Sequence, residues 1–196
     1  MTEQIQRKLS DSKAARWTAL IVVSFTMMCG YFITDCINPM QKLIINELGW
    51  STSEYGFFTG SYGYFNVFLC MLVIGGLILD KKGVRFTGKM SCSLMVLGAA
   101  IKTFALSPLF TNTGMTFGIH NQVLVACLGF ATFGVGCETA GITVSKIIVK
   151  WFTGHELALA MGLQVATARI GTALAMSVPL PIALHFHKMV CMPVLF

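Results

Sequence analysis

Charged side chains are scarce in this chain of 196 residues, where they make up 11% of the total, against about 25% in a typical soluble domain. Hydrophobic residues make up 55%, and the mean hydropathy is +0.74. This balance excludes a domain surrounded only by water and indicates a membrane protein. The formal net charge of +6 does not indicate a nucleic-acid partner, because most of the excess lies beside apolar stretches, where membrane topology explains it.

Motifs typical of metal sites and of enzymes are also missing. The chain has seven cysteines, but no Cys-x-x-Cys pair and no histidine cluster, so we expect no metal site and no other cofactor. Most of the cysteines lie in apolar stretches and are interpreted as small apolar residues. An intramembrane hydrolase would need a histidine near a serine such as Ser61, but His120 and His155 are expected in loops. We therefore expect no catalytic residue.

Long apolar runs divide the chain into a polar start at 1–16, a membrane bundle at 17–183, and a remainder at 184–196 that is a tail or the start of a truncated sixth span. Each run in the bundle is long enough to cross the hydrocarbon core as a helix. Capping boxes, which satisfy free amide groups at a helix start, are predicted at 51–54 and 153–156. Five spans are expected, at about 17–39, 55–79, 90–106, 122–150 and 155–181.

Lysine and arginine are distributed unevenly among the loops. The N-terminus, the segment 80–89 and the turn near Lys146 and Lys150 carry nearly all of them, whereas 107–121 carries none. Cytoplasmic loops are enriched in these residues, so we expect the N-terminus inside and the end of span five outside. The polar start has no dileucine-type sorting signal, which favours a bacterial inner membrane as the location.

Four ionisable side chains lie within the expected spans, where a charge is costly unless it has a structural or functional reason. Asp35 and Lys102 are near outer span ends and can extend to the interface. Glu138 and Arg169 each lie about fifteen residues from the turn at 153–154, which places both roughly 23 Å into the membrane. They are therefore expected at matching depth near the midplane.

Glu138 and Arg169 allow two interpretations, which are compatible with each other. In the first, the two side chains form a salt bridge that lets both be buried. In the second, they form a binding site at which an acid and a base engage opposite ends of a solute. Tyr62 and Gln164 are further candidates for a polar cavity, although packing explains each of them equally well. Pairs of small residues favour close helix packing; they are Gly56 with Gly60, Gly136 with Ala140, and Gly171 with Ala175.

The segment 76–89 has the order Gly-x-x-x-Asp-x-x-Gly-x-Arg between two apolar spans. The first glycine permits close helix approach, an acid follows at the membrane edge, a second glycine turns the chain, and basic residues face the cytoplasm. This order resembles the signature loop of the major facilitator superfamily. A further resemblance, to the branch that includes lysosomal dipeptide uniporters and bacterial relatives, rests on the segments 136–138, 150–164 and 168–171.

The resemblance implies an all-α membrane fold in which this chain forms most of the N-terminal six-helix bundle of a major facilitator. It also implies transport of small organic solutes, short peptides such as dipeptides among them, by alternating access in the lipid bilayer. In that branch the positions of Glu138 and Arg169 line the cavity, with the acid placed for an amino group and the arginine for a carboxylate. Asp35, Tyr62 and Gln164 are the other candidate substrate-binding residues.

The same resemblance makes the 76–89 segment a gate. Its candidate gating residues are Gly76, Asp80, Gly83 and Arg85; the acid is implied to cap a helix of the opposite half and to pair with Arg85. A complete facilitator has two six-span halves, so the implied partner is a missing C-terminal half or a second copy of this chain. The alternative function is a non-transporting membrane scaffold or assembly subunit.

Overall fold

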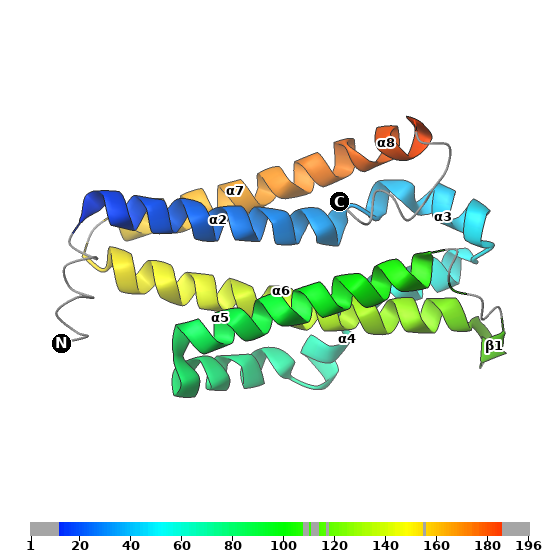
Figure 1. The fold of residues 1–196 in the computed structure, drawn as a ribbon, viewed down its shortest axis with the longest axis horizontal. Helices are drawn as coiled ribbons and strands as arrows, with labels where there is room; N and C mark the ends of the chain where they lie inside the picture. The colour runs from blue at the N-terminus through cyan, green and yellow to red at the C-terminus, as the bar shows by residue number, and fades with distance from the viewer. Residues whose placement is uncertain (1–11, 108–109, 111–113, 117, 155, 186–196) are drawn as a thin grey trace.

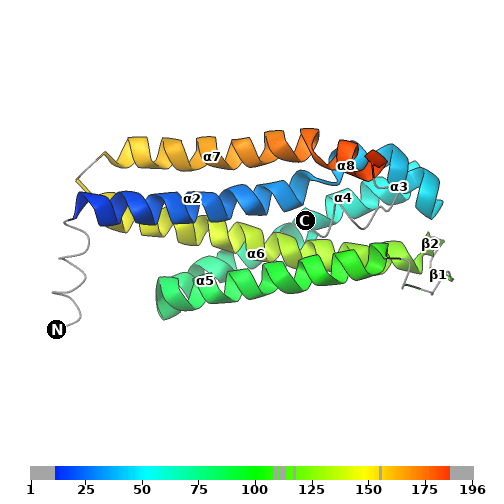
Figure 2. The ribbon, with the colours of Figure 1, turned by 45° about the horizontal axis from the view of Figure 1, so that its top comes forward.

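The computed structural model describes residues 12–107, 110, 114–116, 118–154 and 156–185. Most of the expected polar start and of the expected tail lies outside this range. Figures 1 and 2 show long helices running side by side along one axis, with a short antiparallel hairpin of two strands at one end. The elements in chain order are α2 (Lys13–Asp35), η1 (Asn38–Met40), α3 (Gln41–Leu48), α4 (Thr52–Phe68), α5 (Met71–Leu106), β1 (Met115–Thr116), β2 (Ile119–His120), α6 (Asn121–Phe152), α7 (Leu157–Ser177) and α8 (Pro179–His185).

Four helical segments in the described part of the chain are long and apolar enough to cross a membrane, whereas the sequence predicts five spans. They are Lys13–Leu48, Met71–Leu106, Asn121–Phe152 and Leu157–His185. The difference arises because the expected span 55–79 is divided between α4 and the first part of α5, and because Met71–Leu106 joins that part to the expected span 90–106 across Gly83. α4 ends at Phe68, Cys70 has a positive φ of 48°, and α5 begins at Met71. Neither glycine nor proline occurs at this break, so no sequence pattern indicates it.

The charged segment 80–89 is mostly helical, which corrects the expected loop. α5 is helical throughout except at Gly83, where φ is 79° and ψ is 172°, a conformation that favours glycine. Gly75 and Ser91 both lie against α6, although a straight helix would separate them by about 24 Å. The chain therefore reverses at Gly83, and the second glycine of the signature order makes the turn. Figure 1 shows α5 turning back on itself.

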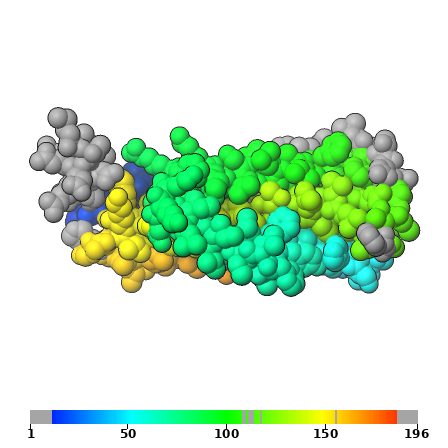
Figure 3. Space-filling model, turned by 90° about the horizontal axis from the view of Figure 1, so that it is seen from below, coloured from blue at the N-terminus to red at the C-terminus, as the bar shows by residue number. Residues whose placement is uncertain are grey.

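α6 is the central helix of the bundle. It packs against both halves of α5 and against α4 on one side, and against α2 and α7 on the other. Figure 3 shows α4 and α5 lying over α6, with only a strip of α6 visible between them. A Cβ atom added at Gly134 would lie 2.2 Å from the carbonyl oxygen of Tyr62, so α4 and α6 touch through their backbones. This contact fixes the level of Tyr62 beside α6.

Close packing also joins α2 and α7, which lie side by side in Figure 2. A Cβ atom at Gly171 would lie 2.3 Å from the carbonyl oxygen of Met28, as expected for a small residue at a helix contact. Gly56, in contrast, has no described atom within 4 Å of an added Cβ, so the first of the expected small-residue pairs does not mediate packing within the described structure.

The first predicted capping box is confirmed and the second is wrong. The Ser51 hydroxyl accepts a hydrogen bond from the amide of Glu54, whose carboxylate accepts one from the amide of Ser51. At the second turn the hydroxyl of Thr153 instead donates to the carbonyl of Val149, and α7 begins at Leu157 without a side-chain cap. His155, in the middle of this turn, lies outside the described residues.

Two apolar clusters lie at different levels of the bundle. One includes Phe58, Val123 and Phe130, near the ends of α4 and α6 that adjoin the hairpin. The other includes Leu20 and Ile148, near the start of α2 and the end of α6. Glu138, described below, lies on α6 between the residues of the first cluster and those of the second.

Candidate functional site

Glu138 and Tyr62 form the best-defined polar contact in the middle of the bundle. The hydroxyl of Tyr62, on α4, donates a hydrogen bond to Oε1 of Glu138, on α6, with a length of 2.8 Å. The close approach of Gly134 to Tyr62 brings the two helices near enough for this contact. The phenol of Tyr62 holds the carboxylate of Glu138. Glu138 is only partly buried, so part of its side chain is exposed.

Arg169, on α7, lies over the ring of Tyr31, on α2. Its Cζ atom is 5.6 Å from the ring centroid, within the range of a cation–π interaction. Tyr31 lies close enough to Glu138, Arg169 and Asp35 to interact electrostatically with all three. Sequence reasoning missed Tyr31, although it precedes Asp35 by one helical turn and therefore shares a face with it.

Glu138 and Arg169 do not form an ion pair in the described structure, where no nitrogen of the arginine lies within 4.0 Å of the carboxylate. Their immediate partners are Tyr62 and Tyr31. The salt-bridge interpretation is therefore not realised in this conformation. Helices α2, α4, α6 and α7 bring Glu138 and Arg169 into one region of the bundle. Because the two charges do not neutralise each other, each can interact with a charged group of a solute.

The other two candidate substrate residues are placed differently. Asp35 is the last residue of α2 and is partly buried, and Asn38 makes a long contact of 3.4 Å with its Oδ1 atom. Gln164 is 7% exposed and belongs to the buried face of α7 together with Ala160 and Ala168. Its position favours the packing interpretation, and a role in binding stays a prediction.

Lys102 does not extend to the membrane interface, which corrects the simpler of our expectations for it. Its side chain is fully buried, at 0% exposure, and Nζ donates a hydrogen bond of 3.2 Å to the carbonyl of Ile33. The ammonium group lies 5.0 Å from the ring centroid of Phe130 and 5.4 Å from that of Phe133.

The gating candidates are partly rearranged relative to the expectation. Asp80 pairs with Lys146 of α6, with 2.6 Å between Oδ1 and Nζ, rather than with Arg85 among the described residues. Gly83 makes the reversal within α5. Gly76 has open space around it, since no described atom lies within 4 Å of an added Cβ.

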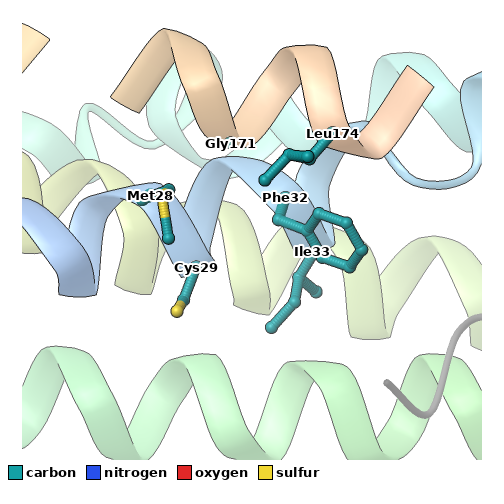
Figure 4. Close-up of a pocket in the computed structure, with 6 residues that line it drawn as sticks. All are labelled: Met28, Cys29, Phe32, Ile33, Gly171 and Leu174. Atoms are coloured by element: carbon teal, nitrogen blue, oxygen red, sulfur yellow. The ribbon is translucent and has the colours of Figure 1, made fainter. Parts of the chain in front are cut away.

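A small apolar cavity of about 100 Å³ lies between α2 and α7 and is separate from these polar groups. Figure 4 shows the residues around it, which include Met28, Phe32 and Leu174. None of the candidate substrate residues lines it. No group of three metal-ligating side chains occurs among the described residues.

Comparison with known proteins agrees with the resemblance noted in the sequence. The family model of the Major Facilitator Superfamily matches residues 20–187. The chain belongs to the major facilitator superfamily. It is an all-α, multi-pass membrane protein of a transporter family and not an enzyme.

Among curated proteins, the chain is similar to the lysosomal dipeptide transporter MFSD1 of several vertebrates. It is 32% identical to the Danio rerio protein over 83% of this chain, and 30% identical to the Mus musculus protein over 84%. The Homo sapiens protein is 28% identical over 84% of this chain. In each case the match covers 32% of the relative, so the chain spans about a third of the length of these proteins. No solved structure matches the chain.

Proposed function

We propose that this chain is the N-terminal part of a secondary transporter that binds small zwitterionic solutes, with dipeptides as the leading substrate class. The observation that carries the proposal is the separate holding of Glu138 by Tyr62 and of Arg169 by Tyr31. A carboxylate and a guanidinium that do not neutralise each other can bind an amino group and a carboxylate of one solute. The name of the similar proteins, lysosomal dipeptide transporter, supports the substrate class.

Tyr31 and Tyr62 have defined roles in this proposal. Each tyrosine positions a charged side chain without cancelling its charge, as a direct salt bridge would. Because the two charged residues lie on α6 and α7, a solute that engages both would connect two helices. Asp35 is a second acid near Tyr31. Gln164 is a weaker candidate for contact with the solute.

The test uses solutes that lack one charge at a time. It is performed on the completed transporter, meaning this chain followed by the second half that the proposal requires, reconstituted in proteoliposomes. The probes are dialanine, its N-acetyl form and its C-terminal amide. We expect Glu138→Gln to weaken dialanine uptake strongly and to leave the small residual uptake of the N-acetyl form unchanged. Arg169→Gln should show the same pattern with the amide.

The control is Glu47→Gln, at an exposed position of α3, which should behave as the unaltered protein. Equal losses of uptake for dialanine and for both blocked forms would mean that the two residues do not bind the charged ends of the solute, and would reject this binding mode.

The second half is essential to the proposal. Five expected spans form one wall of a cavity, and alternating access needs an opposing bundle to move against. We therefore expect no uptake by the purified 196-residue chain alone. The scaffold alternative would be favoured if the completed protein were folded and stable but also failed to transport. In this proposal the N-terminus is cytoplasmic, and the bacterial inner membrane stays a prediction for the location.

A further inference from the structure

The first span contains a break directly after the candidate site. α2 ends at Asp35, and the chain continues through η1 and α3 to Leu48. Pro39 explains the break, because it has no amide hydrogen to donate to the carbonyl of Asp35 and its ring obstructs a continuous helix. A helix that ends inside the membrane leaves carbonyl groups without backbone partners, and these groups need other donors.

Side chains from two other helices donate hydrogen bonds to carbonyls at the break, where the carbonyl of Ile37 also accepts the backbone amide of Met40. Nζ of Lys102, on α5, donates to the carbonyl of Ile33, and the hydroxyl of Tyr55, on α4, donates to the carbonyl of Ile37, each over 3.2 Å. The thiol of Cys36 makes a further, local contact with the carbonyl of Ile33. The end of α2 is therefore tied to both α4 and α5.

The position of Lys102 is unusual for a residue that only stabilises the fold. It is fully buried, and among the described residues no carboxylate oxygen lies within 4.0 Å of Nζ. The phenylalanine faces and the negative end of the α2 dipole partly compensate its charge. Burying a charged group without an oppositely charged partner is costly, and an apolar side chain of similar length avoids that cost. Stability alone thus gives a weak reason for a lysine at this position.

The carbonyl that Lys102 holds lies between two candidate site residues. Tyr31 is two residues before Ile33, and Asp35 is two residues after it. If this turn of α2 unwound, Tyr31 would no longer remain under Arg169 and near Glu138. The same break also sets the direction in which η1 and α3 leave the site.

We propose that Lys102 is a positioning residue, which fixes the last turn of α2 so that Tyr31 and Asp35 stay in the solute site. The proposal rests on the proposed function, since it assigns Lys102 to the same site without contact between the lysine and the solute. It assigns Tyr55 a supporting role at the carbonyl of Ile37, four residues after Ile33.

The test compares Lys102→Met with Lys89→Met in the completed transporter. Methionine removes the donor and the charge while keeping a long side chain, and Lys89 is an exposed lysine on the same helix. We expect Lys102→Met to weaken dialanine binding by roughly tenfold, the scale of a lost hydrogen bond to a charged group. Its melting temperature should be unchanged or higher. Amides within 32–40 should exchange hydrogen faster, while those of α6 keep their rates.

Tyr55→Phe provides a second variant if Lys102→Met does not fold. It should weaken dialanine binding in the same direction, and the double variant should lose less than the sum of the two single losses, because both act on one turn. Faster exchange throughout the bundle with a lowered melting temperature would show a general structural role and overturn the proposal.

Glu138→Gln separates this inference from the proposed function. Loss of binding in Glu138→Gln together with normal binding in Lys102→Met would overturn the positioning role alone. Normal dialanine binding in both variants would reject the proposed function, and the positioning role with it.

Discussion

Asp80 and Lys146 join α5 to α6 across 2.6 Å, at the end of the bundle where lysine and arginine are concentrated. The resemblance implied a pair between Asp80 and Arg85 instead. Gly83 reverses the chain between these two residues, and the observed partner comes from a helix far away in the sequence. The acid of the signature order is thus connected to α6, the helix that also carries Glu138.

The first prediction concerns Asp80→Asn. Both members of the pair are well exposed, at 73% for Asp80 and 42% for Lys146, so we expect a loss of no more than about 1 kcal/mol in stability. In the completed transporter the change should shift the population toward the inward-open state, measured by the accessibility of cysteines at the cytoplasmic gate. Lys146→Met separates two causes: a similar shift would assign the effect to this pair, and no shift would assign it to a contact with the other half. Unchanged accessibility in Asp80→Asn would contradict the gating role.

The second prediction concerns orientation, for which the distribution of lysine and arginine gives the physical reason. A cysteine at Gly114, in a background without native cysteines, should react with an impermeant maleimide added outside intact cells. A cysteine at Lys82 should not react until the membrane is opened. Both positions are exposed, so accessibility of the side chain does not limit either reaction. The reverse pattern would mean that the topology is inverted.

The third prediction concerns Glu54, which lies in the capping box before the expected apolar span 55–79. Burial raises the pKa of its carboxyl, but hydrogen bonds from the amides and side chains of His120 and Ser51 outweigh burial and lower the pKa from 4.5 to about 2. A depressed folded-state pKa stabilises the protein above the unfolded value, and that contribution is lost as the pH falls from about 4.5 to about 2.

Glu54→Gln should therefore reduce the dependence of the melting temperature on pH over that interval, and it should lower the melting temperature at neutral pH. Glu47→Gln, at an exposed position, is the matched control and should leave the dependence as it is. A pH dependence of Glu54→Gln equal to that of the unaltered chain would mean that the contacts with His120 and Ser51 do not stabilise the fold.

The limits of prediction from sequence are clear in the helices. α6 lies within two residues of the expected range 122–150, because a long apolar run rich in glycine is bounded by polar loops. The break at Cys70 is not predicted, since no glycine or proline marks it. Gly83 was identified as a turn, but the residues around it are helical.

The site shows a similar division between local and tertiary information. Glu138 and Arg169 were found because a charge inside an apolar span requires a reason. The sequence also indicates Tyr62 as a candidate, but not its contact with Glu138, and it does not indicate Tyr31, because both contacts join helices that one sequence does not place side by side. Lys102 was recognised as ionisable, but its burial depends on Phe130 and Phe133, which one sequence does not place beside it.

The fourth prediction tests the contact between α2 and α7. Gly171→Ala places a methyl group about where an added Cβ would lie 2.3 Å from the carbonyl of Met28. The helices must separate, and we expect a loss of roughly 1–3 kcal/mol in stability. Gly56→Ala is the control, because the space beside Gly56 is open in the described structure, and alanine favours the helix. Equal melting temperatures for the two variants would contradict the close packing of α2 on α7.

The fifth prediction separates a binding role of Glu138 and Arg169 from mutual neutralisation. Each single reversal, Glu138→Arg or Arg169→Glu, should abolish uptake. If the two residues only neutralised each other, the exchange of both would restore uptake and stability, because a charge in a membrane span is most costly when its partner is lost. The structure gives each a tyrosine partner instead, so we expect the stability changes to be nearly additive in the exchange variant.

Uptake should also remain absent in the exchange variant, because the amino group and the carboxylate of the solute would meet the wrong charges. The measurements are the melting temperature in detergent and the uptake of labelled dialanine by proteoliposomes that contain the completed transporter. Tyr62→Phe provides an independent check, since it keeps both charges and removes only the hydrogen bond to Glu138. It should weaken uptake without abolishing it. Full recovery of uptake in the exchange variant would reject the binding role, because a solute with defined ends cannot be bound equally well when the two charges are reversed.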